Sequence, residues 1–119
     1  MPLRTFESDI EKVEAWLGAT LPAEYVKFLK SHTEWIIGEQ ICLYSVTSLI
    51  ERNETYETLD YCPGYLAIGD DSGGRAVIIP LAEPLKDVYL VGQGDMDRNG
   101  FKLLPLPFSE WLRSGCPVD

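Results

Sequence analysis

Apolar side chains recur at helical spacing through the first thirty residues, and this pattern predicts two amphipathic helices. In the first helix, Ser8 and Glu11 form a capping-box pattern and Gly18 supplies a typical end. In the second, Pro22 occupies the favoured first turn. The apolar faces are expected to consist of Ile10, Val13, Trp16 and Leu17 in the first helix, and of Leu21, Tyr25, Phe28 and Leu29 in the second.

Further along the chain, short runs rich in aliphatic and aromatic residues predict β-strands. The two central runs flank the segment GDDSGG at 69–74, whose glycines and aspartates are typical of a hairpin turn. Ser45 is expected to cap a short helix over 46–52, and residues 53–63 to form an irregular acidic connection. The strands are expected at 40–44, 65–68, 75–79, 88–91 and 101–104, followed by a closing helix that presents Phe108, Trp111 and Leu112.

These elements predict an α+β fold in a single domain, residues 1–119. The connections between strands are too short for the crossovers that parallel strands need, so the sheet should be mainly antiparallel. The two N-terminal helices and the short C-terminal helix are expected to pack against one face of this sheet. A chain of this length buries roughly two thirds of its unfolded surface in one core.

The sequence also indicates the cellular compartment. No apolar run reaches the roughly 18 residues of a membrane-spanning helix, and the first residues lack the apolar centre of a signal peptide. We therefore expect a cytoplasmic protein. The three cysteines, Cys42, Cys62 and Cys116, are odd in number and far apart, which favours reduced buried thiols over a disulfide framework or a metal knuckle.

The charge balance restricts the partners. The 19 acidic and 10 basic residues give a net charge of −9, which repels nucleic acids and anionic lipids and favours a basic protein partner. Several of these carboxylates recur close together, and they form either a solvated surface or an anionic face for lysine and arginine on a partner. The candidate partner-binding residues are Glu51, Glu54, Glu57, Asp60, Asp70 and Asp71.

Two motifs are compatible with other chemistry. Asp71-Ser72-Gly73-Gly74 resembles the nucleophile segment of serine proteases, in which His32 would have to be the base. The inserted Asp70 and the short chain favour a hairpin turn instead. No catalytic residue is therefore predicted.

The DMDRNG segment at 95–100 matches the first half of a calcium loop through Asp95, Asp97 and Asn99. The bidentate glutamate of such a loop is replaced by Leu106, and the flanking segments are predicted strands, which favours a solvated loop. We therefore predict neither a metal site nor a cofactor.

The order of several segments is similar to that in one protein family. These segments are LPAEYVKFL at 21–29, YLAIGDDSGG at 65–74, VYL at 88–90 and FSEWL at 108–112. The chain resembles the SUKH superfamily, which comprises bacterial immunity proteins and fungal cell-wall regulators. The resemblance implies an α+β fold around a strongly curved sheet and no enzymatic activity. For bacterial members it implies neutralisation of a polymorphic or contact-dependent toxin, often a nuclease.

Three hypotheses follow. The first is an immunity protein that occludes a basic toxin with the acidic surface at 51–60 and 70–71. The second is a regulatory scaffold that binds an endogenous protein, as the resemblance to the fungal members implies. The third is a calcium-responsive module at Asp95, Asp97 and Asn99.

Overall fold

The computed structural model describes residues 5–31, 36–37, 41–92, 100–116 and 118. Within this part of the chain, five α-helices and a six-stranded sheet form an α+β fold, which confirms the predicted fold class. The strands follow the order β1-β2-β3-β4-β5-β6, and every neighbouring pair is antiparallel. The elements are α1 (Thr5–Leu17), α2 (Ala23–Ser31), β1 (Ile36–Ile37), β2 (Cys42–Leu43), the 3-10 turn η2 (Val46–Ser48), α3 (Leu49–Tyr56), α4 (Thr58–Tyr61), β3 (Tyr65–Asp70), β4 (Arg75–Pro80), β5 (Tyr89–Gly92), β6 (Lys102–Leu103) and α5 (Phe108–Arg113).

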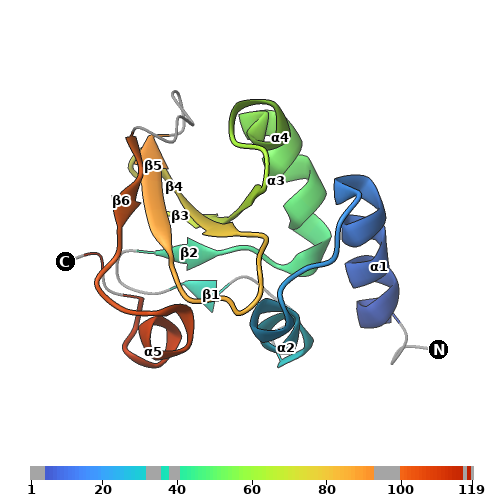
Figure 1. Cartoon of the computed structure of the whole chain (residues 1–119), viewed down its shortest axis with the longest axis horizontal. Helices are drawn as coiled ribbons and strands as arrows, with labels where there is room; N and C mark the ends of the chain where they lie inside the picture. Colours follow the sequence, from blue (N-terminus) through green and yellow to red (C-terminus); the bar gives the residue numbers. More distant parts are fainter. Residues whose placement is uncertain (1–4, 32–35, 38–40, 93–99, 117, 119) are drawn as a thin grey trace.

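The main apolar core lies between one face of the sheet and the helices α2 and α5 (Figure 1). Tyr25 of α2 packs edge-on against Phe108 of α5, with 6.1 Å between ring centroids, and Trp111 is fully buried beside them. These side chains lie on the apolar faces that the sequence predicts. Because successive strand residues point to opposite faces, the sheet contributes every second residue to this core, namely Leu66, Ile68, Val77, Ile79 and Leu90.

The second face of the sheet carries a smaller cluster. Ala67, Ala76, Ile78 and Val91 are buried there together with Cys62. Tyr56 of α3 packs against this cluster, while α3 and α4 lie alongside β3. The predicted packing on one face holds for α2 and α5, while α3 and α4, which that prediction did not include, lie alongside β3.

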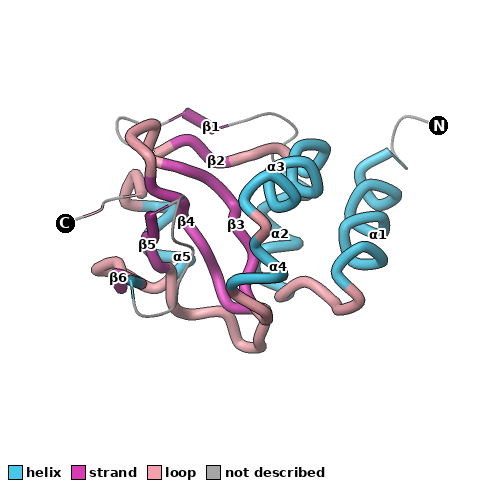
Figure 2. Tube along the Cα trace, turned by 90° about the horizontal axis from the view of Figure 1, so that it is seen from above, coloured by secondary structure: helices cyan, strands magenta, loops and turns pink. Residues whose placement is uncertain are grey.

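Helix α1 lies on the outside of the helical layer (Figure 2). It packs on α2, η2 and α3, and Ile10 and Val13 join the main core. The helix begins at Thr5, so Ser8 lies within it and is not the predicted cap. It ends at Gly18 as predicted, because Gly18 has φ +72° and donates its N–H to the Glu14 carbonyl at 2.9 Å.

The hairpin predicted at 69–74 is confirmed by the pairing of β3 with β4. Glycine is required at position 69 because β2 lies close beside it. A Cβ at this position would lie 2.4 Å from the Cys42 carbonyl oxygen, so any larger residue would force the two strands apart.

The prediction of an irregular connection at residues 53–63 is wrong. This segment is mostly helical, because α3 continues to Tyr56 and α4 follows at Thr58. Ser45 does precede the 3-10 turn, but its hydroxyl contacts those of Thr47 and Ser48 and makes no capping bond to the backbone. The calcium-like motif Asp95, Asp97 and Asn99 lies outside the described residues, as does His32.

Candidate partner-binding surface

The four acidic residues predicted at 51–60 are all exposed on α3 and α4. Glu51 and Glu54 belong to α3 and Asp60 to α4. Glu57 joins the two helices in a left-handed conformation, with φ 55° and ψ 39°. Its N–H contacts the carbonyls of Asn53 and Glu54, and its carbonyl accepts from the N–H groups of Asp60 and Tyr61 at 3.1 Å each. The connection therefore holds the carboxylates on two rigid helices.

Asn53 fixes α3 against the sheet. Its Nδ2 donates to the carbonyls of Leu49 at 2.8 Å and Ala67 at 2.9 Å, and its Oδ1 accepts from the Ala67 N–H at 2.8 Å. Strand β2 pairs with β3 at Gly69 and Asp70, and Tyr44 directly after it donates to the Ile68 carbonyl, so the pairing ends before Ala67. The side-chain amide therefore takes the place of a peptide group of a neighbouring strand.

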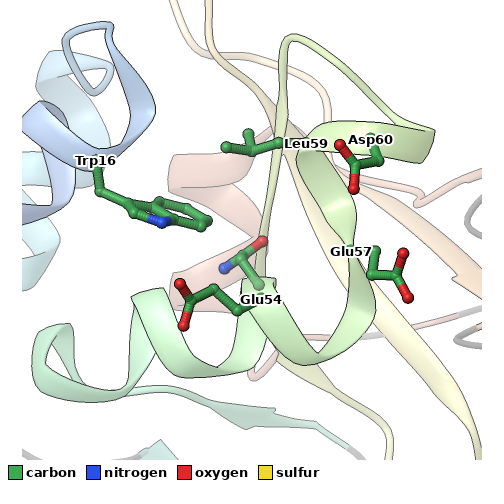
Figure 3. A pocket seen from close by; sticks show the side chains of 6 residues that line it. Trp16, Glu54, Glu57, Leu59 and Asp60 are labelled. Atoms are coloured by element: carbon green, nitrogen blue, oxygen red, sulfur yellow. The ribbon is translucent and has the colours of Figure 1, made fainter.

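A cavity of about 270 Å³ opens between α1 and the α3–α4 unit. Figure 3 shows the Trp16 indole extending from α1 toward the two short helices, with Glu54 and Leu59 on either side of the gap. In the same view the Asp60 carboxylate points toward the cavity, whereas that of Glu57 points away from the indole. The cavity lining consists of Trp16, Asn53, Glu54, Glu57, Leu59 and Asp60.

The carboxylates of Glu54, Glu57 and Asp60 accept no hydrogen bond and form no ion pair within the described part of the chain. They are therefore available to a ligand or partner. A second cavity, between α1 and α2, mixes Glu11 and Glu14 with Lys30, so its lining selects less clearly for one sign of charge.

The other two predicted site residues are used by the fold. Asp70 accepts the Tyr44 hydroxyl at Oδ2, 2.7 Å away, and the Ser72 N–H at Oδ1, 2.9 Å away. Tyr44 in turn contacts the Tyr56 hydroxyl at 2.7 Å, and the Arg52 guanidinium lies 5.4 Å from the centroid of its ring. Burial, together with the bonds to Tyr56 and Asp70, raises the pKa of Tyr44 well above its ordinary value. Asp70 thus anchors the end of β3 to β2 and α3.

Asp71 organises the hairpin turn. Its Oδ1 accepts the N–H groups of Gly73 at 2.8 Å and Arg75 at 3.0 Å, and its Oδ2 accepts Arg75 Nε at 2.7 Å. Desolvation alone would raise the pKa of the carboxyl, but these hydrogen bonds and the Arg75 charge outweigh it, so the pKa is lowered. The Asp71 side chain is only 10% exposed, against 48% for Arg75. It therefore offers a partner little of its charge.

The described residues contain little that resembles catalytic machinery. Ser72 is exposed at the turn and has φ 60°. The three cysteines are buried and free, as predicted, and burial raises the pKa of Cys116 to about 11, which disfavours a reactive thiolate. No group of three or more metal-ligating side chains is assembled in the described part of the chain. Among the described helices, none is long and apolar enough to cross a membrane.

Two cavity residues were missed as site residues. The helical spacing of Trp16 with Val13 assigns it to the core, yet the structure leaves it partly exposed at the cavity wall. Leu59 falls in the segment that was predicted to be irregular. A helical prediction for 53–63 would have placed Glu54 and Asp60 on ordered helices, but nothing in the sequence brings Trp16 next to them.

A family comparison identifies this architecture. Residues 6–114 match the model of the SMI1/KNR4 family (SUKH-1), which covers the elements from α1 to α5. The chain belongs to the SMI1/KNR4 family. The resemblance inferred from the sequence motifs is thereby confirmed. Membership is consistent with an immunity role, and SUKH proteins are generally non-enzymatic.

A relative in Bacillus subtilis (strain 168), named "Uncharacterized protein YnaB", is 36% identical over 70 residues. The aligned region covers 59% of this chain and 46% of the relative. The chain thus spans about half the length of this curated relative.

Proposed function

We propose that this SMI1/KNR4 family member is a non-enzymatic immunity protein of the cytoplasm, built as one domain over residues 1–119. It binds a cognate bacterial toxin domain of basic character, such as a nuclease, and occludes the toxin's active or substrate-binding surface. The binding surface is formed by the exposed faces of α3 and α4 with Glu51, Glu54, Glu57 and Asp60. Asp70 and Asp71 support its edge and make no direct ionic contact.

One observation carries this proposal: carboxylates that the fold does not use surround a cavity with an aromatic wall. Two helices hold the backbone that carries these charges, so little backbone order has to be gained on binding. A negative surface of this kind attracts the cationic groove with which a nuclease holds phosphates. Family membership supports the same conclusion, since the SUKH fold is consistent with immunity proteins.

The electrostatic contribution should act mainly on association. Exposed charge pairs add little affinity, but a complementary field can raise the association rate by one or more orders of magnitude at low salt. The apolar contacts around Trp16 and Leu59 should instead slow dissociation, because buried aromatic anchors dominate interface energetics.

The test is binding to the toxin domain encoded beside this protein's gene, measured by surface plasmon resonance at low and at high salt. The double variant Glu54→Gln with Asp60→Asn should associate about tenfold more slowly at low salt, with a nearly unchanged dissociation rate. The control variant Glu11→Gln with Glu110→Gln removes the same charge from exposed positions on α1 and α5. It should have a much smaller effect.

Growth of cells that express the toxin provides the functional readout, because an immunity protein must restore it. An equal loss of association in both double variants would contradict the assignment of the surface to α3 and α4. If no adjacent toxin binds and an endogenous protein without basic character is recovered instead, the regulatory scaffold replaces the immunity protein as the better hypothesis.

A further inference from the structure

The cavity between α1 and the α3–α4 unit combines features that come from elements far apart in the sequence. Trp16 of α1 forms an aromatic wall, and Leu59 of α4 adds an aliphatic one. Asn53 also lines it, and its side-chain amide bonds to Leu49 within α3 and to Ala67 of β3. These bonds hold that part of the lining in place against the sheet.

The size of the cavity limits its occupant. Its volume of about 270 Å³ lies close to the lower end of the range of roughly 300–1,000 Å³ that is typical of pockets for cofactors and drug-sized ligands. This volume is sufficient for a single long side chain from another protein.

The charge of the lining selects the chemistry of that side chain. Glu54, Glu57 and Asp60 are acidic, and the lining includes no basic residue. Figure 3 places the Glu54 carboxylate on the Trp16 side of α3, while Asp60 faces the gap from the opposite side. An entering cation would therefore meet the Trp16 ring and the Glu54 carboxylate on one side of the gap, with Asp60 across it.

We propose that this cavity receives an arginine side chain of the partner, with the guanidinium stacked on the Trp16 indole and its N–H groups directed to Glu54 and Asp60. This inference rests on the proposed function and names the contact that would position the partner. Arginine suits the site better than lysine for two reasons. Its planar guanidinium stacks on aromatic faces, and it is less strongly hydrated than an ammonium group, so entering a partly enclosed cavity costs less.

The inference can be tested on the isolated full chain with N-acetyl-L-argininamide as the probe. The chain has three tryptophans, and the indole N–H signal of Trp16 is identified in a ¹H–¹⁵N NMR spectrum by its loss in Trp16→Phe. Titration should shift this signal in a saturable way, at millimolar concentrations of the probe. N-acetyl-L-lysinamide should bind about fivefold more weakly, and the neutral citrulline analogue should not saturate.

Glu54→Gln and Glu110→Gln form a matched pair, because both remove one exposed charge from a helix but only Glu54 lines the cavity. We expect Glu54→Gln to weaken arginine binding about fivefold and Glu110→Gln to leave it nearly unchanged. Equal effects of the two variants, equal binding of arginine and citrulline analogues, or no saturable shift would each overturn the inference.

The outcome is separable from that of the proposed function. Toxin binding without an arginine response would leave the immunity function intact and remove only the arginine cavity. An arginine response without any toxin partner would support the arginine cavity and contradict the immunity function.

Discussion

Replacing Asn53 by alanine tests whether one side-chain amide holds the candidate surface to the sheet. Asn53 is 1% exposed and Ala67 is fully buried. The Asn53 amide pairs with both backbone polar groups of Ala67, at 2.9 Å to the carbonyl and 2.8 Å to the N–H. Truncation therefore removes three hydrogen bonds, one of them within α3, and leaves the two buried backbone groups of Ala67 without partners.

The expected cost follows from these groups. Each buried donor or acceptor left unsatisfied costs about 1–3 kcal/mol. The Leu49 carbonyl adds little, because it lies one helical turn earlier and retains its intrahelical partner. Alanine is a better helix former than asparagine by about 0.5 kcal/mol, and water from the adjacent cavity can partly hydrate Ala67. We therefore expect Asn53→Ala to lower the free energy of unfolding by about 2–4 kcal/mol.

Urea unfolding followed by circular dichroism measures this change as a lower midpoint at a constant m-value. The neighbouring exposed residue provides the control, since Glu54→Ala should change stability by no more than about 0.5 kcal/mol. A loss below about 1 kcal/mol in Asn53→Ala would refute the reasoning, because it would show that the Ala67 peptide groups do not depend on the amide.

Three further predictions concern single side chains. Asp71→Asn should reduce the acid sensitivity of the native protein. The lowered pKa of the Asp71 carboxyl stabilises the native protein at pH values above 3.8, the ordinary pKa of the group, and this contribution is lost as pH falls through the folded pKa, so unfolding measured at pH steps between about 2 and 5 should show a smaller loss of stability in the variant. Tyr25→Phe should raise the free energy of unfolding, measured in urea, by about 1 kcal/mol, because the fully buried hydroxyl has no hydrogen-bond partner among the described residues and burial raises its pKa. A loss of stability would show that the hydroxyl is hydrogen-bonded in solution. Glu57→Gly should leave thermal stability unchanged or raise it by up to about 1 kcal/mol, because Glu57 has φ 55°, a left-handed conformation that glycine adopts more easily. The variant should also associate more slowly with a basic partner, and lower stability would contradict the prediction.

The sequence predicts elements well where the decisive information is local. The β3–β4 hairpin follows from the turn chemistry of GDDSGG, in which Asp71 bonds to backbone groups only two and four residues away. The closing helix follows from the spacing of Phe108 and Trp111, both of which are buried. Neither element needs knowledge of a distant partner to be recognised.

The segment 53–63 was mispredicted because its support is not local. Asn53 is a weak helix former, and its bonding partner Ala67 lies 14 residues away on β3. Thr58 is fully buried although threonine is usually exposed. Tertiary contact therefore overrides local propensity here, and a single sequence contains no direct record of that contact.

The same limit applies to Trp16. Its spacing places it on the apolar face of α1, which is correct, but α1 packs mainly on α2, η2 and α3. The outer part of that face consequently ends at a gap beside α3 and α4, and the indole remains partly exposed there. The pattern predicts which side of the helix is apolar and cannot predict how far the neighbouring element extends.

At the candidate site, a carboxylate that only adds to the surface charge differs from one whose oxygens are free to bind a partner. Every carboxylate contributes to the long-range field, so Asp70 and Asp71 help to attract a basic partner even though the fold uses their oxygens. Direct ionic contact requires lone pairs that the fold has not used, and this condition selects Glu54 and Asp60 beside the cavity. Neutralising Asp71 should therefore weaken steering and the hairpin together, whereas neutralising Glu54 should affect binding alone. Specificity for a partner is accordingly expected at α1, α3 and α4, and not at the hairpin where the sequence motif is most conspicuous.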